Sequence, residues 1–325
     1  MKRFAYARAT TVEGAVQALG DRCRPLAGGT DLVGLMKKGL VALDRVVSLR
    51  AIPDLRKMER DENGWRIGAL TTLSKLGDRS DGNIGRQLTV LSEAALSSAS
   101  PQLRHVATLG GNLVQRPRCW YFRNPSTRCW LKGGDHCFAA VGKNAYHAIL
   151  GADMCHIVHP SDPAVALLAL DAEVEVVGPD GSRRIGLGEF FAKPQRGARS
   201  ETVLGADELM TQVLVPGPPA GAQGVYVKVA ERAAWDLALV SAAVQMEITD
   251  DIVEAVKVVL GGVASMPWRV REAERVLTGK ALTAERIEEA ASASSSGAAP
   301  LSDNGYKVRL VEGAVGEALR RLKRA

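Results

Sequence analysis

The chain has 325 residues, enough for two or three hydrophobic cores, because single domains usually contain about 100 to 200 residues. Hydrophobic residues make up 46% and charged residues 24%, which excludes a fibrous or disordered chain. The net charge of +6 comes from scattered basic residues with only 5% aromatic residues, so we do not expect a nucleic-acid-binding protein.

The sequence also argues against a membrane span or an export signal of its own. It lacks a run of about 18 uncharged apolar residues, which a spanning helix requires. Residues 1–20 lack the apolar centre of a signal peptide. We therefore expect a protein that is either cytoplasmic or exported to the periplasm together with a partner that carries the signal.

Residues 1–55 predict a small β-α-β-α-β unit. Thr11 is a suitable helix cap, Gly28 and Gly29 interrupt a strand, and Gly39 ends a helix. The expected elements are a strand at 4–7, a helix at 11–18, a strand at 24–27, a helix at 32–38 and a strand at 46–49.

Residues 56–216 predict a second subdomain of mixed helices and strands. Apolar residues recur on one helical face at 88–99, and Pro101 ends that helix. The residues Gly178 to Gly181 predict a hairpin turn. The expected strands are 65–70, 147–150, 156–158 and 172–177, and the expected helices are 71–76, 88–99 and 163–170.

A third unit, residues 222–325, follows a predicted linker at 216–224 that is rich in Pro and Gly. It predicts a small α+β domain with three strands and two helices. The Ala/Ser-rich stretch 291–299 predicts a flexible loop. The expected strands are 224–228, 238–248 and 253–260, and the expected helices are 283–292 and 306–323.

Two glycine-rich segments have the composition of anion-binding loops. One is Gly28-Gly29-Thr30-Asp31-Leu32 and the other is Gly110-Gly111-Asn112-Leu113. Glycine lets backbone N–H groups approach an oxyanion, and the following Thr or Asn adds a side-chain hydrogen bond. Two such loops can clamp one pyrophosphate, although tight strand-to-helix turns explain the same residues equally well. Neither segment matches a Rossmann or P-loop motif.

Four cysteines, Cys119, Cys129, Cys137 and Cys155, lie within 37 residues that are also rich in arginine. Their spacing lacks the short C-x(2–4)-C pairs of zinc sites, and disulfides would leave Cys23 unpaired. Four thiolates on an irregular loop suit an iron–sulfur cluster, and nearby cations offset their charge. At this point a cluster, disulfides and zinc remain open. The neighbouring basic residues are Arg116, Arg118, Arg123, Arg128 and Lys132.

Other candidate residues have ordinary structural explanations. His136, His147, His156 and His159 crowd the same segment, but four cysteines already complete a cluster, which favours hydrogen-bonding roles. Pro160-Ser161-Asp162-Pro163 has the chemistry of a helix cap. The sequence shows neither a Ser/His/Asp set nor a paired-carboxylate site, so we expect no catalytic acid or base in this chain.

Five motifs, in order, closely resemble the flavin subunit of the xanthine dehydrogenase and molybdenum hydroxylase family. The resemblance covers essentially the whole chain. It implies an α+β fold with a two-part FAD-binding domain of the vanillyl-alcohol-oxidase (PCMH) type, followed by a small α+β C-terminal domain. The motifs are PLAGGTDL at 25–32, ATLGGNLVQ at 107–115, HPSDPAVALLALDA at 159–172, YVKVAERAAWDLALVSAA at 226–243 and GGVA at 261–264.

The same resemblance implies which residues bind FAD. Two segments hold the pyrophosphate, Asp162 reaches the ribityl or adenosine part, and Lys228 lies beside the isoalloxazine. A cation at its N1/O2 edge stabilises the anionic reduced flavin. The pyrophosphate residues are Leu26, Ala27, Gly28, Gly29, Thr30, Asp31 and Leu32 in the first segment, and Thr108, Gly110, Gly111 and Asn112 in the second.

The cysteine stretch most resembles the flavin subunit of bacterial aldehyde oxidoreductases of the periplasmic type. That resemblance implies an insertion at 116–156 whose cysteines, Cys119, Cys129, Cys137 and Cys155, bind a [4Fe–4S] cluster. The flavin subunit of 4-hydroxybenzoyl-CoA reductase carries a comparable insertion and remains an alternative. A non-redox module with structural zinc or disulfides is a third interpretation.

The implied function is electron transfer in a heterotrimeric molybdenum-dependent enzyme that oxidises aldehydes to carboxylic acids. A large partner subunit would hold the molybdenum cofactor and a small one two [2Fe–2S] clusters. Electrons would pass to FAD on this chain and leave to an external acceptor. Substrate chemistry would then occur on another subunit, in agreement with the lack of a catalytic set here.

Overall fold

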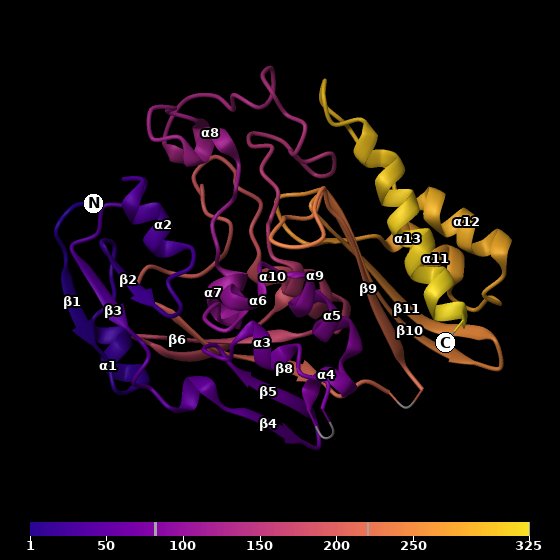
Figure 1. Cartoon of the computed structure of the whole chain (residues 1–325), viewed down its shortest axis with the longest axis horizontal. Coiled ribbons are helices and arrows are strands. Elements are labelled where there is room, and N and C mark those ends of the chain that lie inside the picture. Colours follow the sequence, from indigo (N-terminus) through magenta and orange to yellow (C-terminus); the bar gives the residue numbers. More distant parts are fainter. Residues whose placement is uncertain (81–82, 220, 325) are drawn as a thin grey trace.

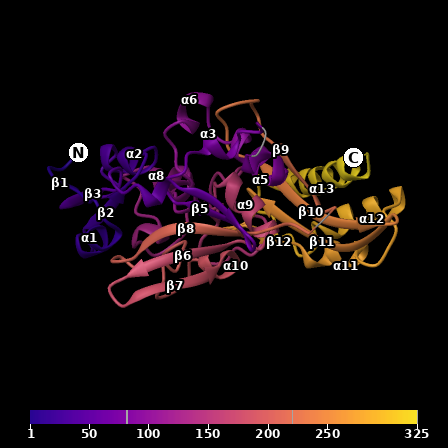
Figure 2. The same ribbon diagram turned by 90° about the horizontal axis from the view of Figure 1, so that it is seen from below.

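The computed structural model describes residues 1–80, 83–219 and 221–324, which form three β-sheets along the length of the molecule. The N-terminal sheet lies at one end and the C-terminal sheet with its helices at the other, with the central sheet between them (Figures 1 and 2). This mixed arrangement of helices and sheets confirms the predicted α+β fold class. Among the described residues, no helix is both long and apolar enough to cross a membrane.

The N-terminal sheet is parallel, with β3 between β1 and β2. Its two helices connect the strands, and the Thr11 side chain caps the first by accepting a hydrogen bond from Gly14 N at 3.0 Å. The order of elements matches the prediction for residues 1–55. The elements are β1 (Ala5–Arg8), α1 (Val12–Gln17), β2 (Cys23–Leu26), α2 (Leu32–Lys37) and β3 (Arg45–Ser48).

The central sheet is antiparallel and has the order β4-β5-β8-β6-β7. Its strands are β4 (Met58–Asp61), β5 (Gly64–Gly68), β6 (Glu173–Gly178), β7 (Gly181–Gly186) and β8 (Leu209–Pro216). The predicted hairpin turn therefore joins β6 and β7. The helices of this region are α3 (Leu73–Leu76), α4 (Ile84–Gln87), α5 (Thr89–Ser97), α6 (Pro101–Arg104), α7 (Leu109–Leu113), α9 (Asp162–Ala169) and α10 (Leu187–Phe190), with a 3-10 turn at Asp54–Arg56.

The C-terminal sheet consists of three long strands and a fourth that contains only two residues, in the order β12-β11-β10-β9. The helices α11 and α13 pack on the sheet, and α12 packs against both of these helices. The helix α9 of the preceding region contacts β10 and β11. Apolar residues of both regions share one continuous core. The elements are β9 (Gln223–Val229), β10 (Val240–Thr249), β11 (Ile252–Gly261), β12 (Trp268–Arg269), α11 (Arg271–Leu277), α12 (Ala284–Ala293) and α13 (Tyr306–Arg324).

Residues 116–159, which we call the cysteine segment, contain little regular structure. They form α8 (Trp120–Arg123) and a 3-10 turn at Trp130–Lys132. The predicted strands at 147–150 and 156–158 are wrong. Ile149 and Leu150 both donate their N–H to Val263 O, and Ala148 donates to His156 O, so the backbone pairs in single contacts and not in a ladder.

Three other predictions needed correction. Sequence patterns missed β4, β8 and α11. The stretch 291–299 is not a flexible loop, because α12 continues to Ala293 and Ser294 is buried. The predicted linker ends earlier than expected, since β9 begins at Gln223, and residue 220 of that linker lies outside the described residues.

Candidate functional site

The first glycine loop, between β2 and α2, exposes backbone donors. In the part of the chain that the structure describes, the N–H groups of Gly28, Gly29 and Thr30 have no hydrogen-bond acceptor. Gly29 adopts a φ of +75°, which favours glycine. A Cβ on Gly28 would lie 2.1 Å from Val106 O, so only glycine fits there. Such free donors form a concavity suited to an anion.

The second glycine segment is different, because most of its donors are already used. Gly110 N donates to Ala69 O at 2.9 Å, and Gly111 N donates to the Thr108 side chain at 3.2 Å. The segment forms the short helix α7 capped by Thr108. Since Gly28 abuts Val106, the two predicted loops are close in space. The first segment offers N–H groups without acceptors, whereas the glycines of the second segment allow the backbone to pack closely against its neighbours.

Asp162 and Lys228 form a buried ion pair beneath this region. Lys228 Nζ lies 2.8 Å from Asp162 Oδ2, and their side chains are 9% and 7% exposed. Lys228 also donates to Ser97 O and Asp236 O, while Asp162 accepts from Tyr226 Oη at 2.6 Å. Burial raises the pKa of the Tyr226 phenol well above its usual value, so this hydroxyl remains a donor. Asp162 and Lys228, which were both predicted to contact FAD, thus form an ion pair with each other.

The helix that follows begins as its sequence suggests. Ser161 caps α9 by accepting a hydrogen bond from Ala164 N at 3.1 Å, with Pro163 in the first turn. The Ser161 hydroxyl also donates to Asn112 Oδ1 at 2.5 Å. The cap of α9 therefore contacts the predicted pyrophosphate residue Asn112. Sequence reasoning identified Ser161 as a cap but did not predict this second contact.

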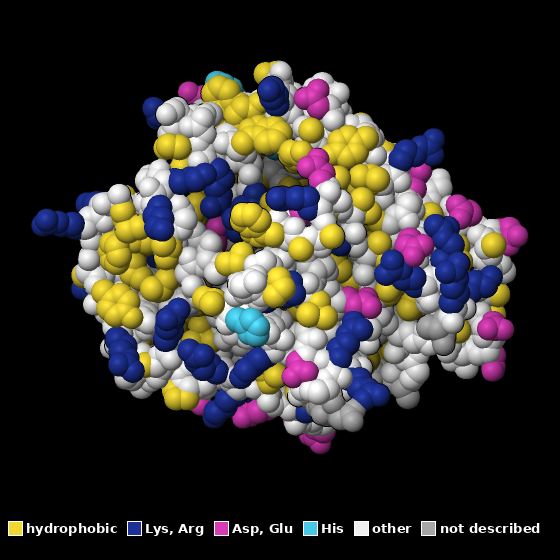
Figure 3. Space-filling model, in the orientation of Figure 1, with side chains coloured by type: hydrophobic (Ala, Val, Ile, Leu, Met, Phe, Trp, Pro, Cys, Tyr) yellow, Lys and Arg dark blue, Asp and Glu magenta, His cyan; other side chains and the backbone are white. Residues whose placement is uncertain are grey.

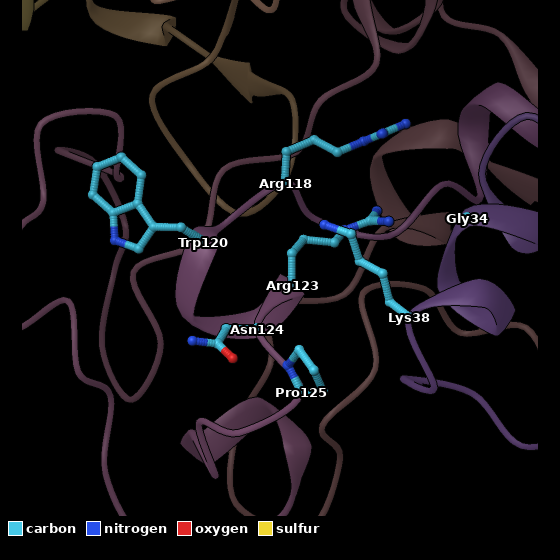
Figure 4. A pocket seen from close by; sticks show the side chains of 7 residues that line it. All are labelled: Gly34, Lys38, Arg118, Trp120, Arg123, Asn124 and Pro125. Atoms are coloured by element: carbon cyan, nitrogen blue, oxygen red, sulfur yellow. The ribbon is translucent and has the colours of Figure 1, made fainter. Parts of the chain in front are cut away.

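A basic cavity of about 710 Å³ opens between α2 and α8. Lys38, Arg118 and Arg123 converge on it, and Trp120 points to the other side of α8 (Figure 4). Lys and Arg side chains also line the rim of the hollow in this face of the molecule (Figure 3). Asp31 pairs with both arginines, at 3.3 and 2.8 Å, which leaves an excess of positive charge. The cavity is suited to an anionic ligand.

An adjoining aromatic cavity of about 230 Å³ lies between the cysteine segment and the loop that joins β9 to β10. Arg118 and Trp120 border both cavities. Tyr146 donates its hydroxyl to Glu231 at 2.8 Å across the rim, which ties the two walls together. The cavity suits a flat apolar ring with a polar edge. Its lining comprises Arg118, Cys119, Trp120, Tyr146, His147, Val158, Glu231, Asp236, Leu237, Ala238 and Leu239.

The four clustered cysteines line a single small cavity together with apolar and aromatic side chains. Its free volume is about 10 Å³, roughly that of one water, and the thiols of Cys137 and Cys155 are hydrogen-bonded to each other. All five cysteines are free thiols. Within residues 1–80, 83–219 and 221–324, no three Cys, His, Asp or Glu side chains have the spacing of metal ligands. The cavity nevertheless provides the four-sulfur donor set that an iron–sulfur cluster requires.

The thiols of this cavity have unequal acidities. Burial raises the pKa of Cys119 to about 11. A hydrogen bond from Cys155 lowers the pKa of Cys137 to about 5, and the same bond raises that of Cys155. Within this hydrogen-bonded pair Cys137 is therefore the more readily deprotonated, and the thiolate is the form that binds metal. Cys23, in β2, is remote in sequence and does not line the cavity.

Two histidines adjoin these groups. His147 Nε2 lies 3.2 Å from Cys119 Sγ, and burial lowers the His147 pKa to about 4, so the ring is neutral. His147 and Cys119 line both the aromatic and the four-cysteine cavity. His159 is buried, which lowers its pKa to about 4, and its Nε2 lies 3.2 Å from Leu113 O. It has the structural role expected of it.

Comparison with known proteins identifies the family. Residues 2–218 match the family described as "FAD binding domain in molybdopterin dehydrogenase", and residues 225–322 match the "CO dehydrogenase flavoprotein C-terminal domain". The chain belongs to this FAD-binding family. The predicted family resemblance is thereby confirmed, as is FAD as the cofactor of the domain.

Relatives of the FAD-binding chain span nearly its whole length. It is 38% identical to the aldehyde oxidoreductase FAD-binding subunit PaoB of Escherichia coli over 86% of this chain and 87% of that protein. It is 28% identical to the glyceraldehyde dehydrogenase medium chain of Sulfolobus acidocaldarius over 93% and 90%. The structure of reconstituted CO dehydrogenase from Oligotropha carboxidovorans matches with a TM-score of 0.78 and 26% identity, covering 98% and 97%.

Proposed function

We propose that this chain is the flavin and iron–sulfur electron-transfer subunit of a heterotrimeric molybdenum-dependent aldehyde oxidoreductase. The observation that carries the proposal is the common wall, Cys119 and His147, between the four-cysteine cavity and the aromatic cavity. The 38% identity to PaoB, named as an aldehyde oxidoreductase subunit, supports the choice of substrate class. The aromatic cavity is linked to the first glycine loop because Arg118, which lines it, lies 3.3 Å from the Asp31 carboxylate.

In this proposal the first glycine loop holds the FAD diphosphate. The free N–H groups of Gly28, Gly29 and Thr30 supply neutral donors, and the basic cavity supplies positive charge. Val106 and Ala107, which precede the second glycine segment, pack against Gly28 and support the loop. FAD, when bound, supplies a store for the two electrons released when an aldehyde and water become a carboxylic acid.

The aromatic cavity is the proposed binding site of the isoalloxazine ring of FAD. Trp120 and Leu237 provide apolar walls, and Arg118 places a cation at the edge, where it would stabilise an anionic ring. Lys228 acts on this cavity indirectly, because its ammonium group holds Asp236 O at 2.8 Å and so fixes the β9–β10 loop. This assigns Lys228 a positioning role in place of the direct ring contact expected from the resemblance.

Cys119, Cys129, Cys137 and Cys155 are the proposed ligands of a [4Fe–4S] cluster. The surrounding Phe122, Trp130, Phe138 and Ile157 keep water out, which protects such a cluster. His147 can donate its Nε2–H to the Cys119 sulfur, since its Nδ1 is buried and has no partner among the described residues. Hydrogen bonds to ligand sulfurs tune cluster potentials.

The proposed partners are a large molybdopterin-binding subunit and a small subunit with two [2Fe–2S] clusters. The 38% identity to a protein named as an FAD-binding subunit supports a division of the cofactors among several subunits. The residues of this chain then bind and orient redox groups, and aldehyde chemistry takes place in the large subunit. Electrons leave from here to an external acceptor.

The test is anaerobic aldehyde-dependent dye reduction by the complex purified with its partners. We expect activity with aldehydes in the intact complex. Gly28→Ala should abolish flavin binding and dye reduction, because its Cβ would clash with Val106 O. Gly313→Ala, where nothing lies within 4 Å, is the matched control and should behave as wild type.

The contrary result is equally specific. A complex that shows no aldehyde-dependent reduction, but uses a low-potential reductant to dehydroxylate 4-hydroxybenzoyl-CoA, would contradict the aldehyde proposal. That outcome would favour the reductase alternative, which carries a comparable cysteine insertion. A flavin-free complex with structural zinc would contradict both redox assignments.

A further inference from the structure

Asp31 ends the first glycine loop, yet its carboxylate is occupied entirely by the cysteine segment. Its Oδ2 accepts the backbone N–H of Arg116 at 2.9 Å. Its Oδ1 accepts from Arg123 Nη2 at 2.8 Å and lies 3.3 Å from Arg118 Nη2. These partners follow Asp31 by 85 or more residues in sequence. The loop and the segment are thus joined at one carboxylate.

Buried hydrogen bonds restrict movement between the glycine loop and the cysteine segment at Asp31. The side chains of Asp31 and Arg123 are only 13% and 12% exposed, so their pairing is shielded from solvent. Arg123 also donates to Pro117 O and to Arg116 O, at 2.7 and 2.8 Å. Charge-assisted hydrogen bonds of this kind are about twice as strong as neutral ones. One guanidinium therefore fixes both the carboxylate and the backbone ahead of the first clustered cysteine.

Cys119 lies in the middle of the stretch that Asp31 holds. Its carbonyl accepts the N–H of Arg123 at 2.8 Å, and it precedes the first residue of α8. Arg118, immediately before it, borders both cavities assigned to the flavin. Any displacement of Cys119 is thus transmitted to Asp31 and to the donors of Gly28 to Thr30.

We infer that Asp31 is a positioning residue that couples flavin binding to cluster binding in this chain. The inference rests on the proposed function, in which the loop binds FAD and Cys119 binds the cluster. Asp31 makes no contact of its own with either group in this scheme. A filled cluster site would order residues 116–123, Asp31 would hold the glycine loop in its binding conformation, and FAD would bind more tightly. Thermodynamic reciprocity then requires FAD to stabilise the bound cluster by the same free energy.

The test is a double-mutant cycle on the full-length chain, with FAD affinity measured by flavin fluorescence. The four proteins are wild type, Cys137→Ser, which removes the cluster away from the Asp31 contacts, Asp31→Ala, and the double variant. We expect the wild-type protein to bind FAD about tenfold more tightly than Cys137→Ser, because both retain Asp31 and only the wild type holds the cluster. The ratio of FAD affinities between Asp31→Ala and the double variant should fall to about one.

Two controls separate coupling from misfolding. Asp31→Asn keeps the shape of the side chain and loses the charge, so a folded protein with reduced coupling is expected. Asp44→Ala removes an exposed carboxylate that pairs with Lys2 and Arg22, and should leave the tenfold ratio intact. A second measurement, the rate of iron release to a chelator, should slow on adding FAD in wild type and not in Asp31→Asn.

The outcomes distinguish this inference from the proposal beneath it. An iron-loaded wild-type protein with the same FAD affinity as Cys137→Ser contradicts the coupling alone. So does a tenfold ratio that survives in both Asp31 variants. A wild-type protein that binds FAD but holds no iron contradicts the cluster, and the coupling is then wrong as well.

Discussion

The C-terminal domain and the cysteine segment are in direct contact, yet they are organised in different ways. In β10 and β11 successive apolar residues are buried on both faces of the sheet, against two hydrophobic cores. In the cysteine segment the apolar cluster is small and includes Cys129 and Cys155 themselves. Regular hydrophobic patterning specifies the first region, whereas polar contacts and thiols specify the second.

The contact between the two regions is also polar. Asn144 is fully buried, and its Oδ1 accepts the N–H of Asp303 at 2.9 Å. Asn304 donates to the carbonyls of His147 and Ala148, both at 3.2 Å. The turn before α13 therefore fixes the position of the residues around His147, whose Nε2 lies 3.2 Å from Cys119 Sγ. This shows how an irregular segment obtains a fixed position from a regular domain beside it.

The largest predicted effect concerns the cysteines. Cys119→Ser should lower bound iron from about four per chain to well below one, since one ligand of the cluster is lost. Cys23→Ser is the matched control, because Cys23 lies in β2 outside the cavity, and should retain all the iron. Iron analysis and visible absorbance measure both. Equal iron in the two variants would contradict the assignment of Cys119 as a cluster ligand.

Lys228→Met should lower the free energy of unfolding by about 3 to 5 kcal/mol, because it leaves the Asp162 carboxylate buried without its cation. The β9–β10 loop would also lose its anchor at Asp236 O. Urea unfolding and flavin retention are the measurements. The exposed pair Lys257–Asp171 offers a control, and Lys257→Met should change stability by less than about 1 kcal/mol. Comparable losses in the two variants would contradict the assigned burial.

A pair of valines sharpens the contrast between the regions. Val315 is fully buried in α13, whereas Val141 in the cysteine segment is 93% exposed. Val315→Ala should cost about 2 kcal/mol through lost burial and a small cavity. Val141→Ala should be within about 0.5 kcal/mol of wild type. Neither should alter iron content; iron loss in Val315→Ala would show that the cluster depends on the C-terminal core.

The last prediction concerns how stability changes with pH. Lys307 is completely buried, with Nζ 2.8 Å from Gly262 O, and burial lowers its pKa from 10.5 to about 7. Between these values the unfolded chain holds a proton that the folded chain lacks, so stability rises with pH from about 7 to 10.5. The slope approaches about 1.4 kcal/mol per pH unit. Lys307→Met should lack this component in urea titrations, and an unchanged slope would refute it.

Sequence patterns predicted much of the fold because most elements follow local rules. Thr11 and Ser161 act as the helix caps that their chemistry suggests, and the long strands of the C-terminal sheet follow their apolar runs. The pattern failed at 147–150, whose apolar residues pack on the C-terminal domain through single backbone bonds to Val263. Apolar composition there reflects burial and not strand pairing.

The candidate site could be predicted only in part for a related reason. The glycines of the first loop and the four cysteines are visible as local motifs. The partners of Asp31 lie 85 or more residues away, and those of Lys228 lie on three different segments. Such pairings depend on the tertiary fold. Arg118 and Trp120, which border both cavities, likewise carry no local signal of that position.

The most direct test of the central claim is the iron, sulfide and flavin content of the anaerobically purified wild-type chain. The account predicts about four irons, about four acid-labile sulfides and one FAD per chain. It also predicts a reducible paramagnetic signal that disappears in Cys119→Ser. A yellow protein with FAD but without iron and sulfide would contradict the claim that the four-cysteine cavity is a redox centre.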